Sequence, residues 1–595
     1  MRILGIYDGH NANAALIEDG KIINAVEEER FSRKKNHDGR ILKGPLDSIK
    51  FCIQDAKQVD LVALALDSPT KLSLAAYQSY LNDLIKPSRR LRSEFLKKNN
   101  PRMVERYQIA PYLLPSMPGI TQQTRIERIK SLLEEVGLQN IPIKFVNHHL
   151  AHHASSYYTS GKERGISFSL DGRGDDLSGM VCECKNGKLN VLSRINWLES
   201  IGHFYSAITV ALGFRAVRHE GKIAGLAAFG NPKEELIKSF NEFFTIDNNG
   251  KIVSKLADGL AIGPYPDANF SWYVKKIKNL IKGQSREDVA HCAQEVLERT
   301  VTQWINFWVK KTKNKNIFLS GGVFSNVRLN QEIMMLNSVK FVYIHPGMTD
   351  TGLGVGAALQ TYHDFREVAK NPFRAEQLQH IYIGPKYSID KNIFKHPSIE
   401  YDEPIELAKK VSSLIHQNKI IAVYQGRLEY GPRALGNRSV LFAAVDRSTN
   451  VWLNKQLGRT EFMPFAPVTL YENAIDCYKI PMGKDPLYTS KFMTITLDCT
   501  EKMKKQCPAV VHIDGTARPQ LITEDNNPFY YQILKAYYKT SGIPSLVNTS
   551  FNMHEEPIVR TPEDAVNSFL RSNLDYLCIG PYLLENKHKQ GLINH

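Results

Sequence analysis

Residues 2–26 have the sequence RILGIYDGHNANAALIEDGKIINAV, in which short apolar runs are separated by polar turns. The first run ends at Asp8-Gly9-His10, and the second ends at Glu18-Asp19-Gly20, a typical hairpin turn before a third apolar run. A helical pattern at 45–56 and an apolar strand at 59–66 follow. This order of three strands, a helix and a further strand predicts an α/β layer architecture.

The same order begins again near Gly165, where an apolar run is followed by Asp171-Gly-Arg-Gly-Asp175. Two similar halves with a cleft between them predict a duplicated, actin-like ATPase domain. The Lys-, Arg- and Pro-rich segment 70–140 is expected to be an inserted, mostly helical segment, which can shape a substrate pocket or form a plain structural cap. A polar linker at about 365–379 places one domain at 1–368 and a second domain at 369–595.

Length and composition indicate a multidomain globular protein. The 595 residues exceed what one hydrophobic core usually supports. The formal charge of +15 favours anionic ligands such as nucleotides and also permits contact with nucleic acid. The N-terminal apolar run is too short for a signal peptide or a membrane span, so we expect a cytoplasmic protein without a membrane partner. Eight scattered cysteines are expected to be reduced, structural thiols.

The segment His148-His149-Leu-Ala-His152-His153 contains two pairs of histidines at i, i+4, so each pair lies on one face of a helix. Either pair can bind a divalent metal, and the spacing does not say which one. Asp171 and Asp350, at the ends of predicted strands, are natural further ligands, although each alone would suit a turn or a helix N-cap. Two His and two Asp favour iron(II), zinc or manganese over calcium.

Two glycine-containing turns predict a nucleotide site in the first domain. Ser320-Gly321-Gly322 follows a buried strand and precedes a helix, so that backbone N–H groups can approach a phosphate, unless the glycines serve only tight packing. A second such turn follows His219. The residues predicted for this site are Gly172, Glu220, Lys222, Gly225, Gly321, Gly322 and Asn326.

The second domain contains a dense cluster of arginines and glycines between Tyr424 and Ser439. Guanidinium groups match phosphate oxygens bidentately, and these arginines lie among Gly, Pro and aromatic residues, unlike a solvated helix face. A second anion site is therefore predicted in this domain. The family resemblance described below implies carbamoyl phosphate and ATP as its ligands. Its residues are Arg427, Glu429, Arg433, Arg438, Lys455, Arg459, Arg518, Asn548, Ser550 and Asn552.

Several common catalytic signatures are missing from the sequence. There is no Gly-x-Ser-x-Gly elbow, no His-Glu-x-x-His motif and no Walker Gly-x4-Gly-Lys-Ser/Thr motif. The sequence therefore does not support a covalent mechanism, and any ATP site has to be of another kind.

Six motifs, in matching order from residue 1 to about 585, resemble those of the NodU/CmcH carbamoyltransferase family, which includes nodulation-factor, cephalosporin and tobramycin carbamoyltransferases. They are Gly9-His-Asn-Ala-Asn-Ala-Ala-Leu16, the run from Glu27 to Lys35, His148-His-Leu-Ala-His152, the stretch from His219 to Ala228, Gly431-Pro-Arg-Ala-Leu-Gly-Asn-Arg-Ser439 and Asn548-Thr-Ser-Phe-Asn552.

The resemblance implies a two-part enzyme: an N-terminal domain similar to the tRNA-threonylcarbamoyl-transferring ATPases and a C-terminal domain with a YrdC-like fold. It implies that ATP, with Mg²⁺, and carbamoyl phosphate give carbamoyl adenylate, and that the carbamoyl group then passes to a hydroxyl. The implied metal ligands are His148, His152, Asp171 and Asp350, with iron(II) as the ion. His10 is implied as the base for the attacking hydroxyl, and Lys35 as a counter-charge to the adenylate.

Three alternatives stay open on the sequence. The first is tRNA threonylcarbamoyl transfer, which the Arg-rich second domain argues against. The second is the same chemistry on a hydroxymethylated base in DNA; binding to DNA would then weaken steeply with salt. The third is a non-catalytic nucleotide-binding regulator. A small-molecule alcohol of secondary metabolism is the expected acceptor by family analogy. The acceptor and the oligomeric state are not specified by the sequence, and a homodimer is compatible with it.

Overall fold

Two five-stranded sheets of identical topology form the N-terminal half of the computed structural model, which describes residues 1–40, 42–56, 58–66, 122–258, 266–394, 396–448, 465–572 and 574–587. The first sheet has the order β3-β2-β1-β4-β5 and the second has the order β8-β7-β6-β11-β12. In each sheet the first three strands are antiparallel and the last two run parallel to the central strand. The predicted duplication is therefore confirmed.

The bounds of these strands are close to those predicted. The first sheet comprises β1 (Arg2–Tyr7), β2 (Asn13–Glu18), β3 (Lys21–Glu27), β4 (Leu61–Ala65) and β5 (Ile143–Val146). The second comprises β6 (Arg164–Gly174), β7 (Leu177–Lys185), β8 (Lys188–Asn196), β11 (Asn316–Ser320) and β12 (Phe341–Ile344). The helices that matter most for the site are α2 (Leu46–Ile53), α6 (Gln122–Glu135), α7 (His148–Tyr157), α9 (Glu220–Leu226), α12 (Arg286–Thr312), α13 (Val327–Met335) and α14 (Leu353–Val368).

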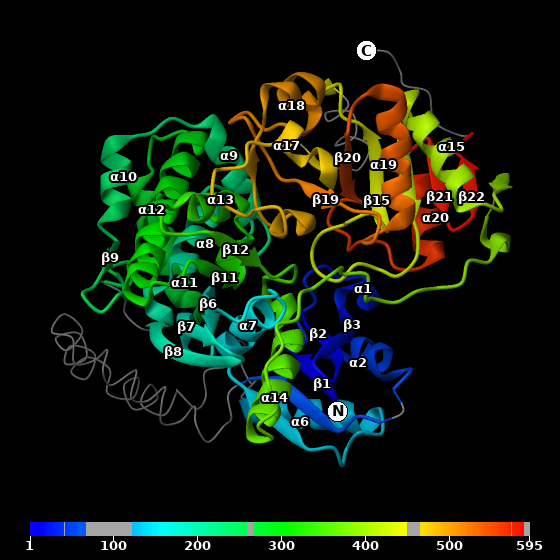
Figure 1. The fold of residues 1–595 in the computed structure, drawn as a ribbon. Helices are drawn as coiled ribbons and strands as arrows, with labels where there is room; N and C mark the ends of the chain where they lie inside the picture. The colour runs from blue at the N-terminus through cyan, green and yellow to red at the C-terminus, as the bar shows by residue number, and fades with distance from the viewer. Residues whose placement is uncertain are drawn as a thin grey trace.

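Helix α14 packs on the first sheet and on α7, beside the place where the two halves meet (Figure 1). Close approach is set by glycine: a Cβ on Gly356 would lie 1.9 Å from the carbonyl oxygen of Ala151 in α7. A Cβ on Gly5 would lie equally close to the carbonyl oxygen of Gly354. The helix continues to Val368, so the first residues of the predicted linker at 365–379 are helical rather than irregular.

The predicted insertion at 70–140 lies largely outside the described residues. Its C-terminal part forms α6 and the approach to β5. All eight cysteines are buried and unpaired, in keeping with reduced structural thiols. None of the described helices combines the length and apolar character that crossing a bilayer requires.

The C-terminal part is built on an eight-stranded mixed sheet with the order β13-β22-β21-β14-β15-β20-β16-β19. Figure 1 shows this part, in yellow to red, above the blue first sheet and beside the green second half. The strands are β13 (Ser398–Glu400), β14 (Ile421–Tyr424), β15 (Arg438–Ala443), β16 (Ala466–Leu470), β19 (Gln520–Ile522), β20 (Ser545–Ser550), β21 (Tyr576–Ile579) and β22 (Tyr582–Glu585), flanked by α15 (Pro404–His416), α19 (Pro528–Ser541) and α20 (Pro562–Arg571).

Candidate metal and nucleotide site

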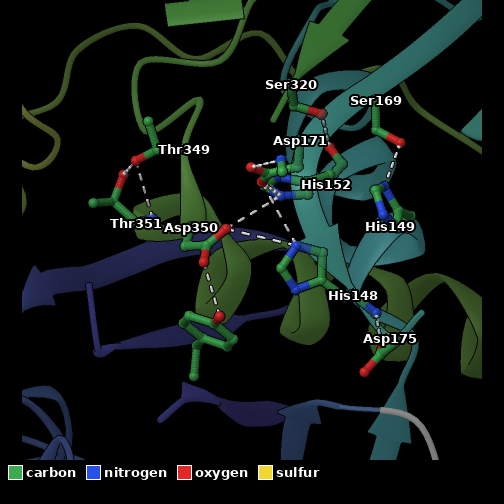
Figure 2. A network of polar contacts seen from close by, with 12 residues as sticks. His148, His149, His152, Ser169, Asp171, Asp175, Ser320, Thr349, Asp350 and Thr351 are labelled. Atoms are coloured by element: carbon green, nitrogen blue, oxygen red, sulfur yellow. Dashed lines mark hydrogen bonds and ion pairs between the residues drawn. The ribbon is translucent and has the colours of Figure 1, made fainter. Parts of the chain in front are cut away.

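The N-terminus of α7 carries the histidines. The side chain of Asn147 accepts hydrogen bonds from the backbone N–H groups of His149 and Leu150, which fixes where the helix starts. His148 and His152 then lie one turn apart, with ring centroids 4.8 Å apart, on the face that points to Asp171 and Asp350 (Figure 2). Of the two pairs that the spacing allowed, the structure brings this one together with the two carboxylates.

Four ligand atoms converge at this point. The Nε2 atom of His152 lies 3.4 Å from Asp171 Oδ2 and 3.6 Å from Asp350 Oδ1. The Nε2 atom of His148 lies 3.8 Å and 3.6 Å from the same two oxygens. All four ligand atoms lie within 4.8 Å of one another.

The buried Nε2 atoms of His148 and His152 have no hydrogen-bond partner among the described residues. Buried polar atoms are normally satisfied, so two orphaned imidazole nitrogens that face two carboxylates fit a divalent cation between them. Two nitrogen and two oxygen donors suit iron(II), zinc or manganese. The residues present therefore fit a metal centre, although the donors do not select one of these three ions.

Contact between His152 and the carboxylates shifts the pKa of His152 upward and that of Asp171 downward. Burial by itself lowers the pKa of His152, but its contacts with Asp171 and Asp350 raise that pKa to about 9. Burial raises the pKa of Asp171, but its contacts with the His148 and His152 imidazoles outweigh this effect and hold that pKa well below its usual range. Asp171 is therefore available as an anion, while a protonated His152 has to lose its proton when a cation binds.

The other two histidines of α7 face the second sheet instead. His149 Nδ1 lies 2.9 Å from Ser169 Oγ, and His153 Nδ1 lies 2.7 Å from Ser167 Oγ. Burial and neighbouring imidazoles lower the pKa of His149 well below its usual value and that of His153 to about 3. These two neutral imidazoles pack α7 onto β6 rather than binding the cation.

Two residues next to the metal ligands were missed on the sequence. The hydroxyl of Tyr7, at the end of β1, donates a 2.8 Å hydrogen bond to Asp350 Oδ2. The carboxylate of Asp175 accepts a 2.7 Å hydrogen bond from the backbone N–H of His148. Tyr7 is the last residue of the apolar run that forms β1, so the pattern alone predicts a core residue. Its position at the end of a strand was the only sign of a role at the site.

We expect Tyr7→Phe to weaken metal binding by about tenfold, because hydrogen bonds that orient a ligating carboxylate typically contribute tenfold or more to affinity. Competition with a chromophoric chelator measures this directly. Tyr478→Phe is a suitable control, since that buried hydroxyl contacts Thr469 in the C-terminal part. Unchanged affinity in Tyr7→Phe would show that the hydrogen bond does not orient Asp350.

Two of the predicted nucleotide residues lie beside Asp171. A Cβ on Gly322 would lie 3.0 Å from Asp171 Oδ1, so this turn touches the metal site. Gly172 follows Asp171 directly, and its N–H donates to that carboxylate. The side chain of Asn326 is engaged by Gln294 and by the N-terminus of α13, and Glu220 accepts from Ser206 and from the N–H of Val217. Lys222 is half-buried and Gly225 is buried in α9.

Gly321 is required by the backbone, since its φ is +100° and a Cβ there would lie 2.2 Å from the carbonyl oxygen of Leu170. We expect Gly321→Ala to lower the free energy of unfolding by about 3 kcal/mol, from strain and collision together. Gly213→Ala is the matched control, because its φ is +84° and nothing lies within 4 Å of the position that the alanine methyl group would take. That change should cost only about 1 kcal/mol. Equal losses in urea unfolding would contradict the contact argument.

His10 lies in the loop after β1, and Lys35 follows the short helix α1 (Glu29–Ser32). His10 is half-buried and its backbone pairs with Asp38. The Asn13 side chain donates 2.8 Å hydrogen bonds to the carbonyl oxygens of Asn11 and Asp350, which ties the loop after β1 to the metal loop. Lys35 is exposed, and its carbonyl oxygen lies 3.4 Å from the Arg218 guanidinium.

The arginine-rich loop of the C-terminal part is organised by Glu429. This buried carboxylate accepts hydrogen bonds from the backbone N–H groups of Leu435, Asn437 and Arg438. Arg438 is fully buried, donates to the carbonyl oxygens of Gln425 and Asn437, and stacks 3.6 Å from the Tyr424 ring. These two residues shape the loop.

Arg427 has a different position from the one expected. Its guanidinium donates to the carbonyl oxygens of Gly384 and Ile383 and to the side chain of Asn24 in β3. It therefore joins the C-terminal part to the first sheet. A long side chain can reach across a domain boundary, which spacing along the chain does not reveal.

The other predicted residues of this loop region lie around the sheet. Asn548 donates to Gln520 and to the carbonyl oxygen of Ala434, and Asn552 donates to the carbonyl oxygens of Met553 and Glu556. Arg433, Arg518 and Ser550 are half-buried. Lys455 and Arg459 lie outside the described residues.

The seam between the two parts contains a further set of residues that the sequence did not single out individually. Glu27 accepts a 2.7 Å hydrogen bond from the N–H of Gly431, and buried Arg30 donates to the carbonyl oxygen of the same residue. The hydroxyl of Tyr430 donates to the carbonyl oxygen of Thr351, next to Asp350. The arginine-rich loop is thereby held against the loop that carries a metal ligand.

Comparison with known proteins gives the following matches. The family models described as carbamoyltransferase N-terminus and carbamoyltransferase C-terminus match residues 2–359 and 412–586. An uncharacterized protein of Methanocaldococcus jannaschii is 30% identical over 98% of this chain and 99% of its own length. Nodulation protein NolNO of Sinorhizobium fredii is 29% identical over 97% of this chain and 79% of its own. Among solved structures, T. kodakarensis HypF aligns with 62% of this chain and 48% of its own at 13% identity, with a TM-score of 0.35, too low to bear on the fold.

Proposed function

Since this chain belongs to the carbamoyltransferase family and is a transferase, we propose that it makes carbamoyl adenylate from carbamoyl phosphate and ATP and transfers the carbamoyl group to a hydroxyl of a small-molecule acceptor. The observation that carries the proposal is the convergence of His148, His152, Asp171 and Asp350, directly joined through Thr351 to the arginine-rich loop of the second part. This contact suits activation at the anion site of the C-terminal part followed by transfer at the metal site of the N-terminal part.

Activation is assigned to the C-terminal part, for which a YrdC-like role is proposed. Carbamoyl phosphate and water give carbamate and phosphate; a carbamate oxygen then attacks the α-phosphorus of ATP, and pyrophosphate leaves. Arg433 and Arg518 are the arginines proposed to bind these phosphates, because guanidinium groups pair bidentately with phosphate oxygens. Glu429 and Arg438 position the loop from which Arg433 projects.

Transfer is assigned to the N-terminal part. An iron(II), zinc or manganese ion held by the four ligands would bind and polarise the phosphate of the adenylate. The acceptor oxygen attacks the carbamoyl carbon, AMP leaves, and His10 takes the hydroxyl proton. Lys35 supplies positive charge opposite the leaving phosphate. Gly322 lies beside Asp171, where the absence of a Cβ would let a nucleotide approach the backbone.

Incubation of the protein with ATP, Mg²⁺, carbamoyl phosphate and iron(II), without acceptor, tests the activation step. We expect pyrophosphate release and carbamoyl adenylate, identified by mass spectrometry. His10→Gln should retain this half-reaction and lose transfer once an acceptor is supplied. A folded, metal-loaded protein that makes no adenylate would refute the proposal.

A further inference from the structure

A single carboxylate of the C-terminal part lies among cationic side chains of the N-terminal part. Glu555 Oε2 is 3.1 Å from the Arg218 guanidinium and 3.7 Å from that of Arg215, and Glu555 Oε1 is 3.4 Å from His219 Nε2. The side chain of His554 adds a fourth contact at 3.7 Å. The positive charge of Lys35 also acts on this carboxylate. Three permanent cations thus surround one anion, which leaves the cluster net positive.

The same junction contains four non-glycine residues in the left-handed region. Val217 has a φ of +64°, Glu555 of +63°, Asn11 of +63° and Asn36 of +57°. Asn36 joins them, because it donates to Asn11 Oδ1 at 2.9 Å and accepts from Arg218 at 3.2 Å. Positive φ is costly for a β-branched residue such as Val217. Backbone strain of this kind persists at ligand clamps and switch regions, so the meeting of four such loops favours a functional junction over a merely structural one.

The position of the junction connects the two proposed sites. Glu555 lies three residues after Asn552, which was assigned to the activation site. Lys35 was assigned to the adenylate, and Glu220, next to His219, was assigned to the nucleotide site of the N-terminal part. An intermediate that is made in one part and consumed in the other needs cations that attract its phosphate along the way. This cluster joins residues of both parts.

We propose that Glu555 is an internal counter-ion that closes the cation cluster of Arg215, Arg218, His219 and Lys35, and that the phosphate of the adenylate displaces it on passing from the C-terminal to the N-terminal part. The inference rests on the proposed function for the identity of the anion. A phosphate monoester or anhydride fits because guanidinium groups pair bidentately with phosphate oxygens and the three permanent cations exceed the single charge of Glu555. Glu220 does not compete, because its carboxylate is engaged by Ser206 and the N–H of Val217.

Binding of AMP, the product of transfer, to the full-length protein at low salt tests this by calorimetry. Glu555→Gln should tighten AMP binding about fivefold, the effect expected when a partly exposed ion pair no longer competes. Arg218→Gln should weaken it. In the Arg218→Gln background, Glu555→Gln should tighten AMP binding by less than half as much as it does in the wild-type background, because the two side chains are coupled through their 3.1 Å contact. The double-mutant cycle cancels any AMP that binds in the C-terminal part.

Glu556→Gln is the matched control. This adjacent carboxylate has similar exposure, but it pairs with Arg571 and Arg33 rather than with the cluster, so AMP affinity should stay unchanged. If Glu555→Gln leaves AMP affinity unchanged or lowers it, the carboxylate is only a structural contact and the proposal is wrong. In that case, carbamoyl adenylate formation by the wild type would still support the proposed function. If instead Glu555→Gln tightens AMP binding and the wild type makes no carbamoyl adenylate, the counter-ion role stands and the proposed function is refuted.

Discussion

Replacing His148 by alanine is expected to weaken metal binding by more than about a hundredfold and to abolish carbamoyl transfer, while carbamoyl adenylate formation persists. Removing even an outer-sphere partner of a ligand costs ten- to a hundredfold, and His148 is one of four direct donors. The residues proposed for activation lie in the C-terminal part, so the half-reaction without acceptor should survive. Metal content by mass spectrometry and pyrophosphate release measure the two effects separately.

The control for that experiment is His416→Ala, an exposed histidine at the end of α15. Metal content should equal that of the wild type. If His148→Ala retains both the metal and carbamoyl transfer, the ligand assignment is wrong. If it loses adenylate formation together with the metal, the metal serves activation as well, and the division of labour between the two parts has to be revised.

Replacing Arg518 by alanine is expected to lower the rate of carbamoyl adenylate formation by more than about a hundredfold, equivalent to about 2.7 kcal/mol of transition-state stabilisation. Arg518 lies between β18 (Thr516–Ala517) and β19, next to Gln520, whose side chain holds the arginine-rich loop through the carbonyl oxygen of Leu435. Metal binding in the N-terminal part should not change. The assay is pyrophosphate release without acceptor.

Arg571→Ala is the matched control for Arg518, because it removes an arginine from the same part whose side chain is 58% exposed. Its adenylate formation should match the wild type within about twofold, as expected for a solvent-exposed ion pair. Normal adenylate formation in Arg518→Ala would remove that residue from the activation site. Synthetic carbamoyl adenylate, supplied directly, should restore transfer in Arg518→Ala but not in His148→Ala, which separates the two sites in one assay.

The repeated strand order could be predicted from the sequence alone, because alternating apolar runs and turn residues such as Glu18-Asp19-Gly20 specify local structure through short-range sterics and hydrogen bonding. The sequence also predicted histidine pairs suited to a metal, since the i, i+4 spacing places each pair on one face of a helix whatever the helix packs against. The turn at Gly321 follows from the same local logic, since only glycine tolerates that backbone.

Which histidine pair faces the carboxylates depends on tertiary packing. Both pairs have identical spacing, and the choice depends on how α7 is rotated when His149 and His153 bond to Ser169 and Ser167 of β6. Tertiary packing likewise brought Tyr7 to Asp350, gave Arg427 a place at the seam, and set Glu555 among cations that lie more than three hundred residues earlier in the chain. Contacts between residues so far apart depend on how whole sheets and loops pack, which no local pattern encodes.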